Sequence, residues 1–525
     1  MATKLKPLPI GIQTFEKIIE GGYTYVDKTK ELYDLVSEGE VYFLSRPRRF
    51  GKSLLVSTLE ALFQNRRELF KGLWIDSSDY KWEKYPVIKI SMPAVDQSMS
   101  IEDLNLALQE RLSEIANDYK INIENRRASL MLRDLIVKLE AQYDKVVVLI
   151  DEYDKPILDN ISNPARVESI RDFLRTFYSE LKENDAKLRF ILLTGVSRFS
   201  KVSIFSGLNN LEDISMSPEF ASICGYTQED LEINFKEYID LYAEFNSGYK
   251  FNNRDELLVT IKEWYNGYRF TEAEIKVYNP FSTLLLFKSR QFAGHWFATG
   301  TPKFLIDIIE SQKYYDVDQF ENIEVGTDSL AKFDINSFDI PSIMYQTGYT
   351  TIKEVKEGGL VLSYPNKEVR KAFIEELSDR FSKMKHEERY SYVNKLIESL
   401  RSTQLNQFIN ILKSYFTEIP YDIQIPLEKY YQSMIYLICR MVSERVKAEV
   451  RTNKGRIDMV IELPTETWII EFKINASADS ALAQIHEKKY YEKYTHLKKP
   501  IKLIGVEFSS TERNITEFKV EDYRV

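Results

Sequence analysis

Cysteine and histidine are scarce in this chain, which excludes several kinds of protein. Its two cysteines, Cys224 and Cys439, cannot build a disulfide framework, and its four histidines show no zinc-site spacing. No apolar run approaches the length needed to cross a bilayer, and residues 1–20 lack the apolar core of a signal peptide. We therefore expect a cytoplasmic protein that does not span a membrane.

A surplus of positive charge is absent as well. The chain holds 71 Lys and Arg against 80 Asp and Glu, and this net charge of −9 argues against a general coat for nucleic acid. Residues 426–525 differ, with 17 basic against 15 acidic side chains. This asymmetry permits a nucleic-acid surface near the C-terminal end without demonstrating one.

The 525 residues are too many for one hydrophobic core and fall into parts of different pattern. In residues 1–225, short apolar runs alternate with helical stretches, as in a parallel sheet covered by helices. Residues 226–376 indicate a mostly helical domain whose many aromatics we interpret as core. Residues 377–425 read as a charged helical connector, and residues 426–525 return to an α/β pattern. The apolar runs of the first part are Val41–Leu44, Val87–Ile90, Val146–Ile150 and Phe190–Leu193.

The first of these runs leads into Gly51-Lys52-Ser53, and a helix is predicted to follow. This is the layout of a phosphate-binding loop, in which backbone N–H groups cradle an anion, a lysine neutralises phosphates and a hydroxyl binds Mg²⁺. The usual pattern asks for glycine where Arg46 stands. Because positive φ is costly at Arg46 and Arg49, we expect a loop conformation suited to L-residues. The two additional cations, Arg46 and Arg49, could strengthen nucleotide binding, and they could equally slow the release of product. Nucleotide binding is therefore predicted more safely than rapid hydrolysis.

A second apolar run ends in the carboxylates Asp151 and Glu152. In P-loop ATPases this arrangement places the Asp at the Mg²⁺ shell and the Glu where it polarises the attacking water. The run that precedes Thr194 supplies a third element, in which Thr194 would sense the γ-phosphate and Arg198 would supply charge to the transition state. A strand-end turn with a surface arginine explains Arg198 equally well.

The C-terminal part contains a separate set of chemical groups. Asp458 precedes a turn at residues 464–467, and Glu471 and Lys473 follow it, so the two segments read as a hairpin. Side chains alternate along a strand, which puts Glu471 and Lys473 on one face. They interrupt an apolar segment, where charge is costly unless it is paired or metal-bound. Phosphodiester hydrolysis needs carboxylates that hold Mg²⁺ and a cation near the attacking water, and these three residues supply them.

Three motifs together resemble the bacterial AAA-ATPase-like family: RPRRFGKS at residues 46–53, IDEYDKP at 150–156 and TGVSRFSK at 194–201. In that family the basic prefix replaces the glycine-rich one, so Arg46 is a family trait. The resemblance implies a P-loop ATPase domain that uses ATP and Mg²⁺, with Glu152 catalytic and Ser53 and Asp151 at the metal. The nucleotide-binding residues would be Arg46, Pro47, Arg48, Arg49, Phe50, Gly51, Lys52, Ser53, Asp151, Thr194 and Arg198.

The C-terminal set resembles the PD-(D/E)XK nuclease superfamily, specifically the nuclease-like module often fused to this type of ATPase. The resemblance implies a restriction-endonuclease-like α/β domain in which Asp458 and Glu471 are metal ligands and catalytic, with Lys473 as the catalytic lysine. Gln484 and Lys488 fall on one face of the following helix and are supporting candidates. Glu428 could complete the metal shell, with Glu449 as its competitor. An ordinary surface helix explains Glu428, Gln484 and Lys488 at least as well.

The leading hypothesis is an ATP-regulated, Mg²⁺-dependent nuclease acting on nucleic acid, with DNA favoured over RNA. The first alternative is a nucleotide-switched binding or assembly protein whose nuclease-like domain is not catalytic. The second is a chaperone-like or signalling ATPase that acts on protein. A homo-oligomer is expected if the ATPase forms a ring, because Arg198 or another arginine would then reach a neighbour's nucleotide.

Overall fold

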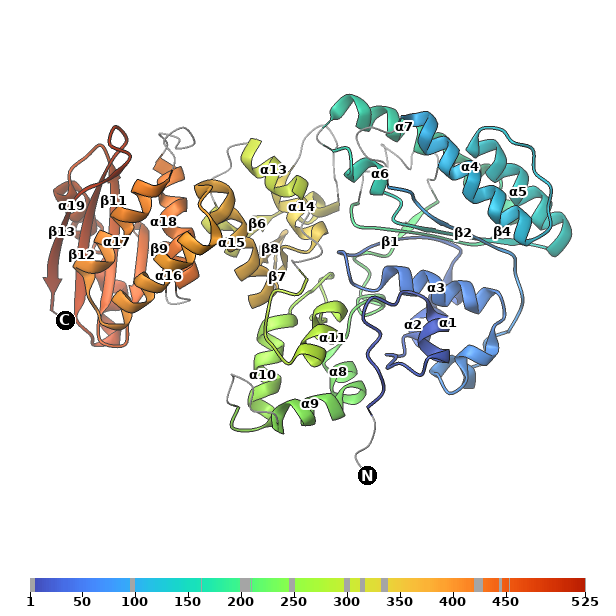
Figure 1. The fold of residues 1–525 in the computed structure, drawn as a ribbon, viewed down its shortest axis with the longest axis horizontal. Helices are drawn as coiled ribbons and strands as arrows, with labels where there is room; N and C mark the ends of the chain where they lie inside the picture. The colour runs from blue at the N-terminus through green and yellow to red at the C-terminus, as the bar shows by residue number, and fades with distance from the viewer. Residues whose placement is uncertain are drawn as a thin grey trace. The chain divides into compact units, whose positions relative to one another are not determined.

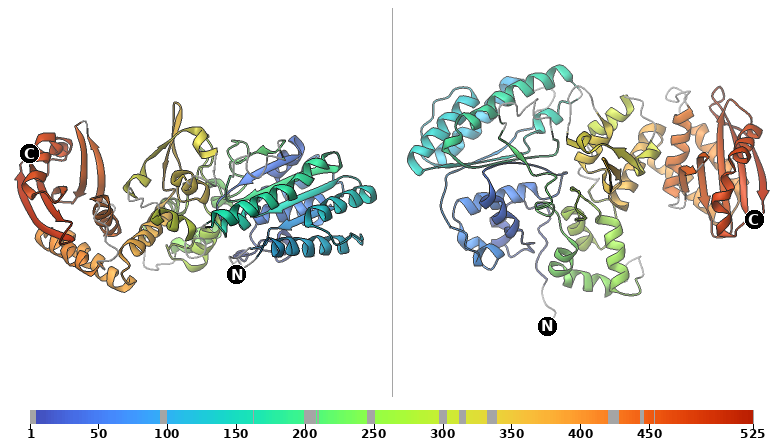
Figure 2. Two further views of the ribbon diagram at one scale, coloured as in Figure 1. Left: turned by 90° about the horizontal axis from the view of Figure 1, so that it is seen from above. Right: turned by 180° about the vertical axis from the view of Figure 1, so that it is seen from behind.

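The computed structural model describes the chain except for residues 1–4, 95–99, 162, 199–207, 209, 245–250, 297–302, 312–316, 332–338, 420–427, 443–445, 453 and 525. The chain forms two compact units (Figures 1 and 2). Unit 1 consists of Met1–Ile308 and Asn322–Val369, and unit 2 of Ile309–Glu321 and Arg370–Val525. The four-part division expected from the sequence stays a prediction.

A five-stranded parallel sheet forms the centre of the first part of unit 1. Its strands lie in the order β2-β3-β4-β1-β5, which confirms the predicted parallel sheet. All six residues of β3 are buried, because helices cover both faces and leave no face for polar side chains. The strands are β1 (Val41–Ser45), β2 (Val87–Ser91), β3 (Val146–Asp151), β4 (Leu188–Gly195) and β5 (Glu212–Asp213).

Helices on either side of this sheet complete a layered α/β arrangement. Figure 1 shows α4, α5 and α7 along one face and α1, α2 and α3 along the other. Several begin at capping side chains; Ser100, for example, accepts a hydrogen bond from Asp103 N at the start of α4. The helices are α1 (Phe15–Glu20), α2 (Thr29–Glu38), α3 (Lys52–Phe63), α4 (Ile101–Asp118), α5 (Ala128–Tyr143), α6 (Lys155–Leu158) and α7 (Pro164–Glu183). Short 3₁₀ helices occur at η1 (Arg67–Phe70), η2 (Trp74–Ser77) and η3 (Asp185–Lys187).

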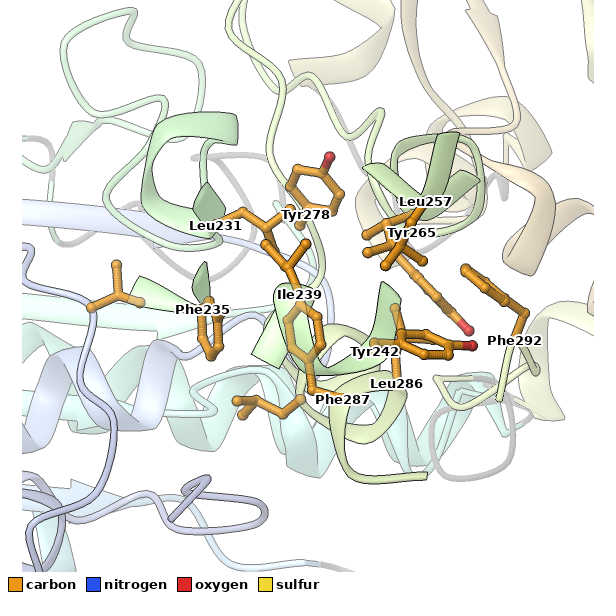
Figure 3. Close-up of a cluster of buried hydrophobic side chains, with 13 residues drawn as sticks. Leu231, Phe235, Ile239, Tyr242, Leu257, Tyr265, Tyr278, Leu286, Phe287 and Phe292 are labelled. Carbon is orange, nitrogen blue, oxygen red and sulfur yellow. The ribbon is translucent and has the colours of Figure 1, made fainter. Parts of the chain in front are cut away.

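The rest of unit 1, residues 226–308 and 322–369, is called the middle region below. Its helices pack around an apolar cluster rich in aromatics, in which Phe235 stacks on Phe287 and Tyr265 on Phe292 (Figure 3). The interpretation of these aromatics as core is confirmed. The helices are α8 (Gln228–Asn234), α9 (Lys236–Glu244), α10 (Arg254–Tyr265), α11 (Pro280–Ser289), α13 (Lys303–Ser311), which ends in unit 2, and α14 (Ile340–Thr347).

The middle region also contains a small antiparallel sheet that the sequence analysis did not predict. Its order is β6-β8-β7, and Gly358, at φ +78°, lies in the turn between β7 and β8. Only two of the six residues of β7 are buried, so its sequence resembles that of an exposed, charged segment rather than a strand. The strands are β6 (Ile323–Val325), β7 (Thr351–Lys356) and β8 (Gly359–Ser363), and the 3₁₀ helix η5 (Thr327–Ala331) lies nearby in sequence.

Unit 2 is built on a mixed five-stranded sheet in the order β13-β12-β11-β10-β9. β11 and β12 run parallel, and the remaining neighbours are antiparallel, including the predicted β10–β11 hairpin. Helix α19 packs on one face, whereas Phe408 of α17 and Tyr431 of α18 contact Trp468 and Phe508 on the other. The strands are β9 (Val446–Thr452), β10 (Gly455–Glu462), β11 (Thr467–Ile474), β12 (Ile501–Ser509) and β13 (Asn514–Tyr523). The helices are α15 (Lys367–Ser382), which begins in unit 1, α16 (His386–Arg401), α17 (Leu405–Glu418), α18 (Glu428–Val442) and α19 (Ala478–Lys488), with 3₁₀ helices η4 (Val317–Glu321) and η6 (Tyr490–Leu497).

A buried carboxyl group, that of Glu368, lies inside unit 1 at the start of α15. Its Oε1 accepts hydrogen bonds from Trp296 N at 2.8 Å and from Ser282 Oγ at 3.0 Å. Its Oε2 is buried and receives no hydrogen bond from a described residue. Burial raises the pKa of Glu368 to about 7, although the hydrogen bonds from Trp296 and Ser282 oppose the shift. At pH values between the ordinary glutamate pKa and about 7, the Glu368 carboxyl is therefore protonated in the folded protein and ionised in the unfolded chain.

We predict that Glu368→Gln stabilises unit 1 more at high pH than at low pH. A raised folded-state pKa stabilises the wild type below the unfolded pKa, and this contribution is lost as pH rises towards about 7. Glutamine keeps an acceptor for Trp296 and cannot ionise. Relative to wild type, the variant should gain about 2 kcal/mol between about pH 5 and about pH 8. Calorimetric melting of both proteins measures this, and exposed Glu357→Gln should show no such trend.

Candidate functional site

The predicted phosphate-binding loop connects the end of β1 to the start of α3. Gly51 adopts φ +98° directly before α3, and Lys52 is the first residue of that helix. The buried Lys52 ammonium donates to the carbonyl oxygens of Arg46 at 2.8 Å and Pro47 at 3.0 Å. Burial lowers the pKa of Lys52, and Asp151 and Asp154 oppose this shift. The loop thus folds around a cation that faces nearby carboxylates.

A cavity of about 420 Å³ opens above this loop. Its wall contains both charged and apolar side chains, as a bound nucleotide with phosphates and a base would require. The charged and loop residues in its wall are Arg48, Arg49, Gly51, Lys52, Ser53, Glu152, Asp154 and Lys155. The apolar wall includes Pro9, Ile12, Ile18, Leu54, Leu158, Val196, Pro280, Phe281 and Leu284. The structure therefore brings the lysine loop and Glu152 to one cavity.

The ends of β3 and β4 meet beside the loop, as their parallel pairing requires. Thr194 Oγ1 donates to Asp151 Oδ1 at 2.6 Å, and both side chains are buried. Glu152 is more exposed, and its carboxylate contacts Lys155 Nζ at 2.9 Å. Its backbone has φ +55°, a left-handed conformation that costs about 1–3 kcal/mol in a non-glycine residue. This conformation turns the chain directly after β3, between Asp151 and the start of α6.

Asp154 is a residue that the sequence analysis quoted within a motif but assigned no role. It is buried, and its Oδ2 accepts from Val196 N at 3.0 Å and Ser197 N at 2.6 Å. Burial raises the pKa of Asp154, although these hydrogen bonds and Lys52 oppose the shift. A Cβ on Gly195 would lie 2.7 Å from Asp154 Oδ1, so only glycine fits there. Asp154 thereby fixes the chain after β4 against the cavity.

Two predicted nucleotide-binding arginines lie outside the cavity wall. The Arg46 guanidinium is buried, donates to the carbonyls of Ser45, Ser215 and Phe220, and lies 4.4 Å from the centre of the Phe270 ring. Arg198 pairs with Asp213, with Nη2 at 2.6 Å from Oδ2. In this conformation neither guanidinium is placed with Lys52, and their predicted roles toward ATP stay predictions.

The expectation of a loop without positive φ at its arginines is wrong for Arg49. Arg49 adopts φ +68°, and Gly51 adopts φ +98° two residues later. The Arg49 guanidinium lies 4.7 Å from the centre of the Phe281 ring, a cation–π contact that offsets part of the backbone cost. The sequence alone could not show this contact, because Phe281 is more than two hundred residues away.

The C-terminal candidate residues gather where two strands of unit 2 separate. β10 pairs with β11 from Met459 and Ile470 onward to the turn, whereas Glu471 and Lys473 pair with β12. At the point of separation, Asp458 Oδ2 accepts a hydrogen bond from Phe472 N at 2.8 Å. The Asp458 carboxylate thus takes the place of a backbone carbonyl of β10 as the acceptor for Phe472 N–H, and it lies beside Glu471.

Glu471 is the central residue of this group. It is 1% exposed, and its Oε1 accepts from Gln484 Nε2 and lies 3.6 Å from Lys473 Nζ. Its Oε2 is buried and receives no hydrogen bond from the described residues. Burial and the nearby Asp458 raise the pKa of Glu471 to about 8, and Lys473 opposes this shift. The ion pair confirms that Glu471 and Lys473 share one face of β11.

The supporting candidates are placed differently from one another. Gln484 contacts Glu471 directly, whereas Lys488 Nζ pairs with its neighbour Glu487 at 2.9 Å. Tyr490, which the sequence analysis did not name, has its hydroxyl 3.4 Å from Gln484 Nε2. The side chains of Glu428 and Glu449 lie outside the described part of the structure, although Glu428 begins α18.

The donor set of unit 2 suits a divalent cation such as Mg²⁺. Among the described residues, no group of three or more His, Cys, Asp or Glu side chains could hold a metal by itself. Mg²⁺, however, is usually bound by one or two carboxylates, with waters and substrate phosphates as further ligands. Asp458 and the unpaired Oε2 of Glu471 provide that number. These two carboxylates thus suit a cation whose remaining ligands are waters and substrate phosphates.

Comparisons with known proteins agree with these two sites. The family model "Predicted AAA-ATPase" matches residues 9–205, and the model "PD-(D/E)XK nuclease superfamily" matches residues 427–518. A relative from Azotobacter chroococcum mcd 1, "Uncharacterized protein in vnfD 5'region", is 38% identical over 535 residues, covering 98% of this chain and 99% of the relative. The chain belongs to the predicted AAA-ATPase family. This AAA-ATPase-like chain carries a PD-(D/E)XK superfamily domain at its C-terminal end.

These two domains support a nucleotide-dependent role related to nucleic acid. Among solved structures, the Aeropyrum pernix Orc1 protein in complex with DNA matches 67% of this AAA-ATPase-like chain and 93% of its own chain. The identity is 10% and the TM-score 0.21, a likeness too low to carry an argument. Within the described residues, no helix is long and apolar enough to traverse a bilayer.

We predict that Glu471→Gln separates stability from metal binding in unit 2. Without metal at about pH 9, the variant should melt at or above the wild-type temperature, because a buried carboxylate with a raised pKa is replaced by a neutral amide. Excess Mg²⁺ should raise the melting temperature of the wild type and not that of the variant. Thermal melting with EDTA and with Mg²⁺ measures both effects. Equal Mg²⁺ shifts in the two proteins would contradict the metal assignment, and exposed Glu512→Gln serves as the control.

Proposed function

We propose that this AAA-ATPase-like protein binds and hydrolyses ATP in unit 1 and cleaves nucleic acid with Mg²⁺ in unit 2. The observation that carries the proposal is the convergence of Asp458, Glu471, Lys473 and Gln484 where β10 and β11 separate. Burying Glu471 and Lys473 in the otherwise apolar strand β11, with Asp458 of β10 nearby, is energetically costly, and phosphodiester chemistry explains why the chain would retain them.

In unit 1, the loop residues Gly51, Lys52 and Ser53 would hold the phosphates of ATP. Asp151 and Ser53 would hold Mg²⁺, which neutralises phosphate charge when bound. Glu152, which lines the same cavity as Lys52, would take a proton from an attacking water. Thr194, through its hydrogen bond to Asp151, would register whether the γ-phosphate is present. Arg198 would need to leave Asp213 to act on the nucleotide.

In unit 2, Asp458 and Glu471 would bind the cation that activates water and polarises the scissile phosphate. Lys473 would stabilise the developing negative charge, and Gln484 would orient Glu471. We favour DNA over RNA as substrate and a cytoplasmic location, with ATP controlling access to the substrate. A homo-oligomer follows if the arginine that completes the ATPase site comes from a neighbouring copy.

A second candidate function is a nucleotide-switched binding protein whose nuclease-like domain does not cut. Within the described residues, no group of three or more His, Cys, Asp or Glu side chains gathers at this site, and so small a ligand set favours this alternative. The cleavage experiment below decides between the two.

For the ATPase, we predict that Lys52→Ala lowers the affinity for ATP by at least about tenfold, since a buried cation that meets phosphate is removed. Glu152→Gln should keep the affinity and lower kcat by about 100-fold or more, as expected for loss of a general base. Equilibrium binding and phosphate release measure the two quantities. Lys30→Ala, an exposed lysine on α2, is the matched control. Hydrolysis unchanged in Glu152→Gln would refute the assigned base.

For the nuclease, we predict that Asp458→Ala and Lys473→Ala each lower Mg²⁺-dependent DNA cleavage by about 100-fold or more. Cleavage of linear and circular DNA, with and without ATP, measures the loss and any dependence on nucleotide. The control is Lys502→Ala on neighbouring β12, whose amine pairs with Asp522 at 2.8 Å. DNA binding without cleavage in the wild type would favour the second candidate function.

A further inference from the structure

Five consecutive residues of the phosphate-binding loop each contact the middle region of unit 1. The Arg46 guanidinium lies over the Phe270 ring, and a Cβ on Gly348 would lie 2.7 Å from Pro47 Cβ. The Arg48 carbonyl accepts from Trp296 Nε1 at 3.1 Å. Arg46, Pro47 and Arg48 therefore each lie against the middle region.

The next two residues continue these contacts. The Arg49 guanidinium lies over the Phe281 ring, and Phe50 is buried with its ring centre 4.7 Å from Tyr268. Left-handed backbone at the non-glycine residue Arg49 is retained only when the surroundings hold it, whereas Gly51 adopts it freely. The middle region provides those surroundings from outside the loop.

The inner side of the same loop determines where the Lys52 ammonium lies. Its Nζ donates to the carbonyls of Arg46 and Pro47, and Arg48 supplies the next carbonyl of the chain. Trp296 Nε1 donates to that third carbonyl. The Pro47 and Arg48 carbonyls belong to consecutive planar peptide units, so only the two backbone dihedrals of Arg48 separate them and a displaced Arg48 displaces the Pro47 carbonyl. Holding Arg48 therefore holds the acceptors of Lys52.

Trp296 itself is fixed in place. Its side chain is fully buried, its ring packs edge-on against Tyr349 at 5.3 Å, and its backbone N–H donates to Glu368 Oε1 at 2.8 Å. The same carboxyl oxygen accepts from Ser282 on α11, the helix that also carries Phe281. Glu368 thus ties together the two places from which the middle region touches Arg48 and Arg49.

We propose that Trp296, anchored by Glu368, is a positioning residue that clamps the Arg48 carbonyl and so sets the Lys52 ammonium for ATP. The inference rests on the proposed ATP site, and it assigns the Arg48 carbonyl and the Arg46 and Arg49 ring contacts to holding the loop. Because the clamp acts through the loop, its loss changes nucleotide affinity rather than the chemical step.

The test compares Trp296→Phe with Trp264→Phe, a tryptophan of the same region that packs on Phe292. Trp296→Phe removes the N–H donor and keeps most of the ring. We expect KM for ATP to rise about fivefold, the value of one hydrogen bond, with kcat within about twofold. Trp264→Phe should match the wild type. Equal rises in both variants, or a loss in kcat alone, would overturn the proposal.

Hydrogen exchange without nucleotide separates this proposal from the ATP assignment. Amides of residues 46–53 should exchange about fivefold faster in Trp296→Phe and in Glu368→Ala, whereas Glu368→Gln, which keeps the acceptor, should restore wild-type exchange. Unchanged exchange in this segment, or a uniform increase throughout unit 1, would overturn the clamp. If ATP binds neither the wild type nor Lys52→Ala, the proposed function fails while the exchange result still decides the clamp.

Discussion

The buried ammonium of Lys52 is the constraint on which the organisation of unit 1 depends. A charge removed from water needs polar partners, and here they are two loop carbonyls with Asp151 and Asp154 nearby. To bring those carbonyls round, the loop takes left-handed backbone at Arg49 and Gly51. The aromatic side chains of the middle region then cover the loop from outside. Sheet, loop and middle region are thereby joined around one cation.

Unit 2 also buries an ionisable side chain among polar partners, but there the side chain is an acid, Glu471, rather than a lysine. Glu471 is buried in a strand that helices cover on both faces, and its partners are Lys473, Gln484 and the neighbouring Asp458. The strand can contain these groups because β10 leaves β11 at this point and the backbone ladder is interrupted. The separation of two interior strands of the sheet is thus what allows an apolar strand to contain charged side chains.

The sequence predicted the architecture well wherever burial leaves a simple pattern. The four apolar runs became neighbouring parallel strands, and the Asp458 and Glu471 segments became a hairpin. β7 was missed because its exposed charged residues hide a strand. Trp296 was missed for a different reason: a hydrogen bond between residues 248 positions apart leaves no local pattern. The sequence motif locates the backbone of Arg46 in the loop, but it could not show that the guanidinium contacts Ser215, Phe220 and Phe270.

The course of α15 limits how this protein can be divided. The boundary between the units falls between Val369 and Arg370, three residues into that helix, and another falls inside α13 between Ile308 and Ile309. Three residues do not complete one helical turn, so a fragment that stops at Val369 would leave Glu368 on a frayed end. The units are compact in space, yet the chain cannot be cut at their border without unravelling a helix that unit 1 needs. A truncated ATPase fragment would have to retain the later turns of α15 to keep that carboxyl in place.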